Sequence, residues 1–322
     1  MRLLKLVPDN TNINFMRWRN VALVLSIIVT IASIALVGVR GLNLGVDFVG
    51  GQMITVKFEK KAPIEDVRAT VSGLNVGDAS IQEFGDPNTL SIRMGLPEEG
   101  GDAAAAAVAS KVRKAIQAKH ADAKFAVDSV SGKVSNELYK WGAISVALAM
   151  LGIAVYIWFR FEWQFGVGAL LTLFHDVCMT IGFFSLTQLE FNLNVVAAIL
   201  TIVGYSLNDT VVIYDRIREN LRKYRKMDIV PLLNLSLNET LSRTMVTSLS
   251  IMFALLALLL IGPEVIFGLT IAILLGIFVG TYSSIYISSP VLVWLGVSAD
   301  SFLPKTSAGA PGAERVASLN EG

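Results

Sequence analysis

Six long runs of apolar residues dominate the chain, and each is close to twenty residues long. They cover residues 21–39, 141–159, 165–186, 195–214, 244–261 and 265–287. A helix needs about 20 such residues to cross about 30 Å of hydrocarbon, so the pattern predicts six transmembrane helices. The first run exceeds the apolar core of a cleaved signal peptide, which spans about 7–15 residues. We therefore favour an uncleaved anchor helix over a signal peptide.

The periodicity changes between the first two runs, in residues 40–140. The sequence there predicts, in order, a strand at 51–59, a helix at 64–71 behind Pro63, strands at 80–84 and 89–94 around Gly-Asp-Pro-Asn, a helix at 102–119 and a strand at 124–130. The order βαββαβ is that of a ferredoxin-like fold. We therefore predict a polytopic α-helical membrane protein with an α+β ferredoxin-like domain between helices one and two. Short linkers at residues 40–44 and 132–140 would join this domain to the helices.

Composition agrees with a membrane protein. The 322 residues are 53% hydrophobic, and the mean hydropathy is +0.60. A net charge of +1 provides no global field that would attract nucleic acid. The single cysteine, Cys178, excludes an internal disulfide.

Charge predicts the orientation of the helices. Residues 1–20 contain four Lys and Arg residues and the predicted loop 215–243 contains seven, whereas the short loops 187–194 and 262–264 contain none. Positively charged loops stay in the cytoplasm. This places the N-terminal segment 1–20, the loop 215–243 and the small, polar, disordered tail 304–322 in the cytoplasm. Residues 40–140, between helices one and two, then face outward. The lysines of this segment do not contradict the orientation, because long domains are exempt from the charge rule.

Asp209, in the fourth apolar run, is the strongest candidate for chemistry. A charged group inside a membrane helix costs at least a few kcal/mol and commonly marks an ion or proton path. Arg243, at the start of the fifth run, is its candidate counter-ion across the predicted loop. The alternatives are that Asp209 snorkels from a helix end and that Arg243 anchors at the headgroups. On a helical period Tyr205 shares a face with Asp209, and Asn208 can also point towards the bundle.

Two further polar features lie in the helices. His175 and Asp176 fall near the middle of the third run, and as neighbours they are expected to point in different directions. We expect a proton relay or hydrogen bonds between helices there, and no metal site. The sixth run has small residues every four positions, which predicts close internal helix packing ahead of partner docking; they are Gly268, Ala272, Gly276, Gly280, Ser284 and Ser288.

The outward segment contains no pattern of an enzyme site. Its glycine-rich stretch GLNLGVDFVGG (residues 41–51) is predicted to lead into a strand, and it matches no phosphate-binding motif. No nucleophile triad or carboxylate pair occurs there either. We therefore expect no catalytic residues and no cofactor.

Four motifs carry a resemblance to a known family. GLNLGVDFVGG, the HDV of helix three, VGYSLNDTVVIYDRIREN in helix four and NETLSRTMVTS at helix five resemble those of the SecF family. That family supplies accessory subunits of the bacterial Sec protein translocase and is related to the RND superfamily of proton-driven exporters. The resemblance covers residues 17–295.

The resemblance implies a role in secretion at the bacterial inner membrane. SecF proteins form a heterodimer with SecD and associate with the SecYEG channel and YajC. They use the proton-motive force to promote export of preproteins that the SecA ATPase has started across the membrane. The intramembrane aspartate and arginine implicated in proton transport fall on Asp209 and Arg243. Part of the proton site would lie on SecD.

Two other hypotheses stay open at this point. An RND-type exporter of lipids or small molecules would be expected to have two large outward domains and twelve helices, twice the content of this chain. A non-transporting scaffold would use Asp209 only structurally. Proton flux with the partner present separates the scaffold from the motor subunit.

Overall fold

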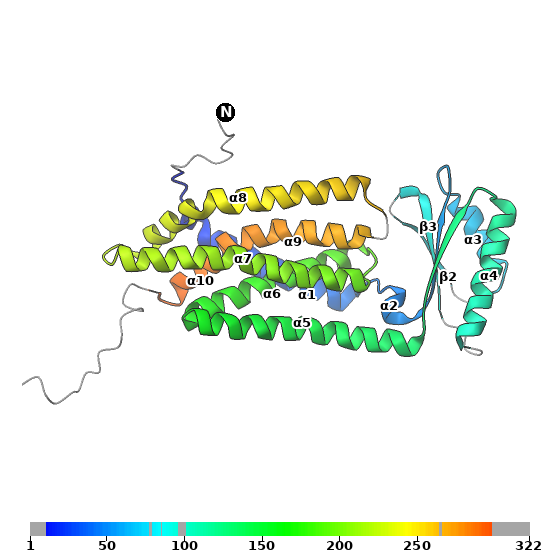
Figure 1. Ribbon diagram of the computed structural model, residues 1–322, viewed down its shortest axis with the longest axis horizontal. Helices are drawn as coiled ribbons and strands as arrows, with labels where there is room; N and C mark the ends of the chain where they lie inside the picture. The colour runs from blue at the N-terminus through cyan, green and yellow to red at the C-terminus, as the bar shows by residue number, and fades with distance from the viewer. Residues whose placement is uncertain (1–10, 77–78, 85, 96–100, 264–265, 298–322) are drawn as a thin grey trace, which may run out of the picture.

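The chain forms an elongated bundle of long helices with a small α/β domain at one end (Figure 1). The computed structural model describes residues 11–76, 79–84, 86–95, 101–263 and 266–297. The helices of the bundle are α1 (Arg19–Arg40), α5 (Gly132–Arg160), α6 (Trp163–Thr187), α7 (Leu193–Lys223), α8 (Ile229–Ile261), α9 (Phe267–Tyr286) and α10 (Ser288–Trp294), and a 3₁₀ turn, η1 (Phe15–Trp18), precedes α1.

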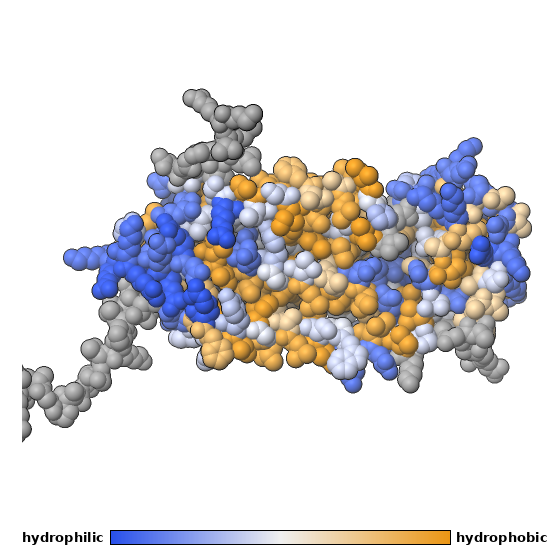
Figure 2. Space-filling model, viewed as in Figure 1, coloured by the Kyte–Doolittle hydropathy of each residue, from blue (hydrophilic) through white to orange (hydrophobic). Residues whose placement is uncertain are grey.

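Within the described ranges, six helical segments are long and apolar enough to cross a membrane, the sixth being α9 together with α10. The predicted fold class is thus confirmed for the bundle. Figure 2 shows a broad apolar belt across the visible face of the helices and hydrophilic residues at both ends. Many large apolar side chains of α1 and α5 are exposed on this belt. Such a surface is stable only against lipid or another membrane protein.

The small domain has the predicted ferredoxin-like topology. Strands β1 (Gly51–Lys57), β2 (Ala79–Phe84), β3 (Asp86–Met94) and β4 (Lys124–Val130) form an antiparallel sheet in the order β2-β3-β1-β4. Helices α3 (Ile64–Ser72) and α4 (Gly101–Lys119) pack on the face away from the bundle (Figure 1). Side chains alternate between the two faces along each strand. On the face that carries α3 and α4, this alternation places Ile54, Val56, Leu90 and Ile92, which are fully buried and form the core of the domain.

Residues 215–243, which the sequence predicts as a loop, are mostly helical in the structure. Helix α7 continues to Lys223 and α8 already begins at Ile229, so only residues 224–228 connect them. The apolar period of both helices continues beyond the membrane, and Ile217, Leu221 and Leu237 pack in one core cluster. Arg216 and Arg218 of α7 are half-buried and bind Glu239 of α8 and Glu162, respectively. The charged residues of this stretch led to the prediction of a loop, whereas the stretch forms parts of two amphipathic helices.

Two local predictions need correction as well. The predicted linker 132–140 is the first part of α5, which begins directly after β4 with Ser131 as its N-cap. The glycine-rich stretch 41–51 contains a short helix, α2 (Val46–Val49), before β1. The predicted disordered tail 304–322 lies outside the described residues.

Candidate intramembrane proton site

Helix α7 carries two rows of polar side chains on two of its faces. Ser206, Thr210 and Tyr214 follow one another at four-residue spacing and are buried, whereas Tyr205 and Asp209 form a second row one residue earlier. The first row makes hydrogen bonds to α6, α9 and α10, and the second faces α8. Helix α7 is therefore the centre of the polar interior of the bundle.

Asp209 is almost completely buried, with 3% of its surface exposed. It lies about 24 Å along α7 from Leu193, in the half of the bundle away from the α/β domain. Ser248 of α8 is beside its carboxylate. Ser248 also accepts a hydrogen bond from Tyr205 (3.0 Å) and lies 2.9 Å from the hydroxyl of Thr281. Tyr205 thus binds the same serine that lies beside Asp209, as expected from their shared helix face.

One oxygen of the Asp209 carboxylate has no hydrogen-bond partner in the described part of the chain. The hydroxyl of Thr244, buried on α8, also has none. Because α7 and α8 are antiparallel and Tyr205 lies opposite Ser248, the same register places Thr244 opposite Asp209. An unsatisfied buried polar group costs about 1–3 kcal/mol. Asp209 and Thr244 thus place an unpaired acceptor and an unpaired hydroxyl in the same seam between α7 and α8.

Arg243 does not form the direct ion pair that the sequence predicted. Its charge is near enough to act on Asp209, but no Arg243–Asp209 ion pair within 4.0 Å occurs among the described residues. The Arg243 side chain is exposed on the surface of α8. Asn208 is exposed on α7, so the prediction that it points into the bundle is wrong. Consecutive helical residues differ by about 100° in direction.

Asp176 of α6 is the centre of a second polar cluster, which is completely buried. Its Oδ1 lies 2.9 Å from Nδ1 of His175. Its Oδ2 accepts hydrogen bonds from Ser206 of α7 (2.6 Å) and Ser283 of α9 (2.9 Å). One carboxylate therefore joins three helices, as the predicted role in helix bonding requires.

Two features of this cluster differ from the prediction. His175 and Asp176 are neighbours that bind each other, whereas they were expected to point apart. The sequence analysis also missed Ser206 and Ser283 as partners. Both are small polar residues within apolar helices, but only the packing of α7 and α9 against α6 shows that their hydroxyls meet one carboxylate.

The small-residue ridge of α9 packs inside the bundle, which confirms the preferred interpretation. A Cβ atom on Gly276 would collide with the side chain of Ile202, and one on Gly280 would lie 3.2 Å from Ser206. Ser284, further along the ridge, lies 3.0 Å from Thr210 through the two hydroxyl groups. The ridge lets α9 approach α7 closely enough for the hydrogen bonds to Asp176 to form.

Replacing Gly276 with Ala is expected to destabilise the bundle by about 1–3 kcal/mol, because overpacking forces two tightly packed helices apart. The measurement is the free energy of unfolding in detergent micelles. Gly204→Ala on α7 is the matched control, since nothing lies within 4 Å of the added methyl, and it is expected to change stability little. Equal effects of the two substitutions would contradict the packing role of Gly276.

The α/β domain is fastened to the loop between α6 and α7. The backbone of Phe191 accepts a hydrogen bond from Gly45 (2.9 Å) and donates one to Asn43 (2.8 Å). Asn43 also donates to the carbonyl of Gln188 (2.8 Å). The segment before the sheet and the segment before α7 therefore pair through one parallel β-bridge, between Leu44 and Phe191.

Arg93 and Glu190 add a buried charge contact to this junction. From β3, Arg93 donates to Oδ1 of Asn43 (2.9 Å) and to the carbonyl of Leu44 (3.0 Å), and its Nε lies 3.9 Å from Oε2 of Glu190. The Glu190 side chain is 7% exposed, and that oxygen has no hydrogen-bond partner in the described structure. Burial raises the pKa of Glu190 above its ordinary 4.5, and Arg93 opposes this effect.

The junction is expected to be tighter in acid than at neutral pH. Because the pKa of Glu190 is raised in the docked state, docking favours the protonated carboxyl. The resulting stabilisation is complete below pH 4.5 and is lost as the pH rises through the raised pKa. Hydrogen-exchange protection of the Gly45 and Phe191 amides, corrected for intrinsic exchange, measures the effect.

Glu190→Gln is expected to remove this pH dependence and to keep the two amides protected at neutral pH. Glu83→Gln is the control, because Glu83 borders the same cavity of about 370 Å³ but is exposed. Protection that rises with pH in the unmodified protein would contradict the assignment to Glu190.

No metal centre is found among the described residues. They contain no group of three or more His, Cys, Asp and Glu side chains close enough to hold an ion. The roles that fit His175 and Asp176 are therefore hydrogen bonding and proton transfer.

Comparison with known proteins places this geometry in a family. Residues 109–298 match the family described as "Protein export membrane protein SecD/SecF, C-terminal", and residues 35–62 match the "SecD/SecF GG Motif". The Protein translocase subunit SecF of Rickettsia rickettsii is 43% identical over 290 residues, which cover 90% of this chain and 94% of that protein. The chain belongs to the SecD/SecF family.

A solved structure agrees with the SecD/SecF assignment. The crystal structure of SecDF from Thermus thermophilus, titled a translocon-associated membrane protein, superposes with a TM-score of 0.81 at 33% identity. A second SecDF structure, in a form called super-membrane-facing, gives 0.66 at the same identity. Each match covers 89% of this chain but only 39% of the SecDF chain. This chain is thus similar to about two fifths of that larger protein.

The SecD/SecF GG motif has a clear structural basis here. Gly50 and Gly51 have φ angles of +78° and +115°, which L side chains rarely adopt. A Cβ on Gly51 would also collide with the carbonyl of Met94. Asp47 of the same motif accepts a hydrogen bond from the backbone of Leu193 (2.9 Å), the first residue of α7. A carboxylate at a helix N-terminus is favoured by the helix dipole, so the motif holds the end of α7 as well as the sheet.

Proposed function

We propose that this protein is an accessory subunit of the Sec protein translocase that uses the proton-motive force, together with SecD, to promote export of polypeptides. Relatives that cover nearly the whole chain are named protein translocase subunit SecF. The larger SecDF chain to which it is similar carries additional sequence. In this proposal SecD supplies that additional part as a separate polypeptide.

The observation that carries the proposal is the incomplete site around Asp209. Its carboxylate is buried at membrane depth with one oxygen unpaired. Asn208 and Arg243 are exposed on neighbouring helices close by. Facing lipid, a charged side chain at this depth would cost about 2.5–3.5 kcal/mol. A partner helix bundle that covers this face would lower that cost and complete the proton site.

Helix α7 provides the coupling between that site and the outward domain. One continuous helix runs from Leu193, held by Asp47 and by the junction at Glu190 and Phe191, to Asp209. A change in the charge of Asp209 alters how α7 packs against α8. Any resulting shift of α7 reaches the α/β domain directly, in addition to the routes through residues 40–44 and α5.

The proton-motive force would move the polypeptide in many small steps. One proton that crosses 100 mV releases about 2.3 kcal/mol. This is enough to bias the domain between two orientations, but it cannot move a long polypeptide in one stroke. In the proposed cycle the SecA ATPase starts a preprotein through the SecYEG channel, and repeated proton transfers here help to draw it out. YajC is a further proposed partner, and the charge pattern supports both termini in the cytoplasm.

Proton flux into liposomes that contain this protein and SecD tests the proposal. Under an imposed gradient, the complex is expected to carry protons faster than either subunit alone. A scaffold that does not transport protons would give a flux equal to that of protein-free liposomes, and this result would refute the motor role. A complex with Thr201→Val, an exposed position on α7 whose hydroxyl bonds only its own helix, controls for leakiness caused by mutation.

A further inference from the structure

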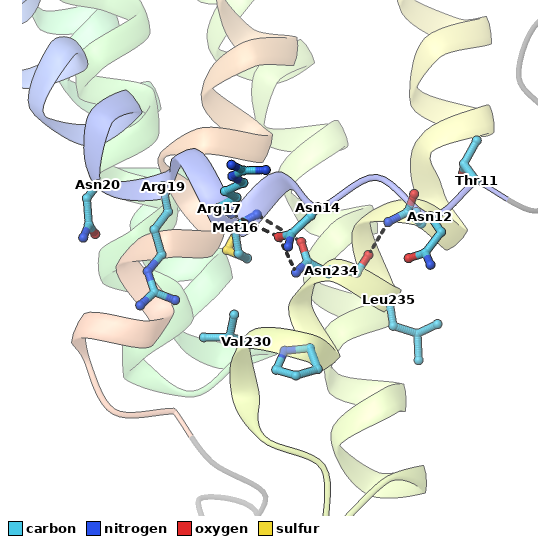
Figure 3. Close-up of a pocket in the computed structure, with 12 residues that line it drawn as sticks. Thr11, Asn12, Asn14, Met16, Arg17, Arg19, Asn20, Val230, Asn234 and Leu235 are labelled. Carbon is cyan, nitrogen blue, oxygen red and sulfur yellow. Dashed lines mark hydrogen bonds between the residues drawn. The ribbon is translucent and has the colours of Figure 1, made fainter.

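A recess lies at the end of the bundle opposite the α/β domain. It measures about 820 Å³ and is enclosed by residues 11–20, before and at the start of α1, and by the first turns of α8. Figure 3 shows Arg17, Arg19 and Asn20 on one side and Asn234 and Leu235 on the other. Neither the proton site nor the junction with the α/β domain uses this recess.

Asparagine side chains hold the walls of this recess together. Asn238 makes two hydrogen bonds to the backbone of Ile13, one to its N–H and one to its carbonyl, both at 2.9 Å. Asn234 accepts from the backbone of Met16 (3.0 Å) and donates to Asn14 (3.1 Å). These bonds join segments more than 200 residues apart in sequence. The recess is therefore a built feature of the fold.

Two arginines border the recess without acidic partners. Within the described ranges, neither Arg17 nor Arg19 has an ion pair, and the lining residues described for the recess include no Asp or Glu. The arginines of α7 at the same end behave differently, since Arg216 and Arg218 bind carboxylates of their neighbours. In the described part of the chain, the recess thus combines two arginines that form no ion pair with amide groups that can donate hydrogen bonds.

The position of Trp18 indicates how deep the recess lies relative to a membrane. Trp18 lies between the two arginines in sequence and is 58% exposed, and Val21, one turn later, is 60% exposed. Tryptophan is enriched at the boundary between hydrocarbon and headgroups. The apolar belt in Figure 2 gives way to hydrophilic residues at this end of the bundle. The recess therefore lies where lipid phosphates are found, with apolar side chains beside it for acyl chains.

We propose that this recess binds the headgroup of an anionic phospholipid. Arg17 and Arg19 would pair with the phosphate, because guanidinium groups form charge-assisted hydrogen bonds to phosphate oxygens. Amides such as Asn12 and Asn20 would bind the remaining headgroup atoms, and the acyl chains would run along Trp18 and Val21. The bound lipid would add a further link between the start of α1 and α8, beside the asparagine bonds and the apolar packing of Phe15 and Met16 in the cluster that includes Leu233.

Native mass spectrometry of the purified full-length protein with phosphatidylglycerol tests the proposal. The protein is expected to retain phosphatidylglycerol and to release phosphatidylcholine. The double variant Arg17→Gln/Arg19→Gln is expected to bind phosphatidylglycerol roughly 30-fold more weakly, the loss typical of two cations at an anionic membrane surface. Arg17→Lys/Arg19→Lys is expected to keep most of the affinity, since both charges remain.

Arg225→Gln/Lys226→Gln is the matched control, because these exposed cations lie at the same end of the molecule but outside the recess. It is expected to bind phosphatidylglycerol like the parent. An equal loss in this control would show that only the general positive charge attracts lipid, and would overturn the proposal. Unchanged binding by Arg17→Gln/Arg19→Gln would overturn it too. Competition by inorganic phosphate at millimolar concentration would mean that the recess takes a free anion and not a lipid.

Discussion

Replacement of Asp209 by Asn is expected to abolish the proton-driven part of secretion. Asparagine has nearly the same size but cannot release a proton, so a cycle of protonation at this position would stop. The measurement is export of a preprotein into membrane vesicles with an imposed proton gradient. The rate is expected to fall to that of vesicles that lack this subunit.

The same variant is expected to fold normally and to keep its association with SecD. One oxygen of Asp209 has no hydrogen-bond partner among the residues that the structure describes, so the substitution breaks few contacts and stability is expected to change by less than about 1 kcal/mol. Thr201→Val, an exposed position on α7, is expected to leave export unchanged. Full gradient-dependent export by Asp209→Asn would exclude the proposed proton role.

Replacement of Asp176 by Ala is expected to cause the largest loss of stability, about 2–5 kcal/mol. The change removes the acceptor for His175, Ser206 and Ser283 together. Each hydrogen bond between membrane helices contributes about 0.6–2 kcal/mol. His175 and Ser206 would lose a buried partner, whereas Ser283 would keep its bond to the carbonyl of Gly280 (3.1 Å). The free energy of unfolding in mixed micelles measures the loss.

Asp176→Asn is expected to cost about half as much, because the amide keeps one acceptor oxygen. Thr180→Val on the same helix is the matched control. The Thr180 hydroxyl is equally buried but bonds only to a carbonyl of its own helix, that of Asp176 (2.9 Å). Its removal is therefore expected to cost less than about 1 kcal/mol. If Asp176→Ala were as mild as Thr180→Val, the cluster would not be what joins α6, α7 and α9.

The two aspartates differ in a way that suits different roles. Asp176 has every oxygen satisfied by three groups and no exposed surface. Asp209 has one unpaired oxygen and an arginine that it does not directly bind. A fully bonded carboxylate stabilises one arrangement of helices, whereas an incompletely bonded one can change partners. Asp209 is therefore the better candidate for proton transfer.

Local periodicity in the sequence was enough to predict the helices and the small domain. Apolar runs near twenty residues specify membrane helices because backbone groups in hydrocarbon must bond within their own segment. The order of strands and helices in residues 51–130 specified the ferredoxin-like fold, since strand alternation and helical period act over a few residues. Asp209 was also selected as a candidate site residue from sequence alone, because an ionisable residue in an apolar run is costly.

Only the tertiary structure decided how the polar groups meet. Arg243 appeared to be a direct partner for Asp209 while residues 215–243 were taken as a loop, but continuous helices place it on the outer surface of α8. The bonds from Ser206 and Ser283 to Asp176 depend on close packing at Gly276 and Gly280. The pairing of Asn43 with Phe191 joins segments almost 150 residues apart. Such contacts depend on how separate helices pack and turn about their axes, and no periodicity within a single segment determines that.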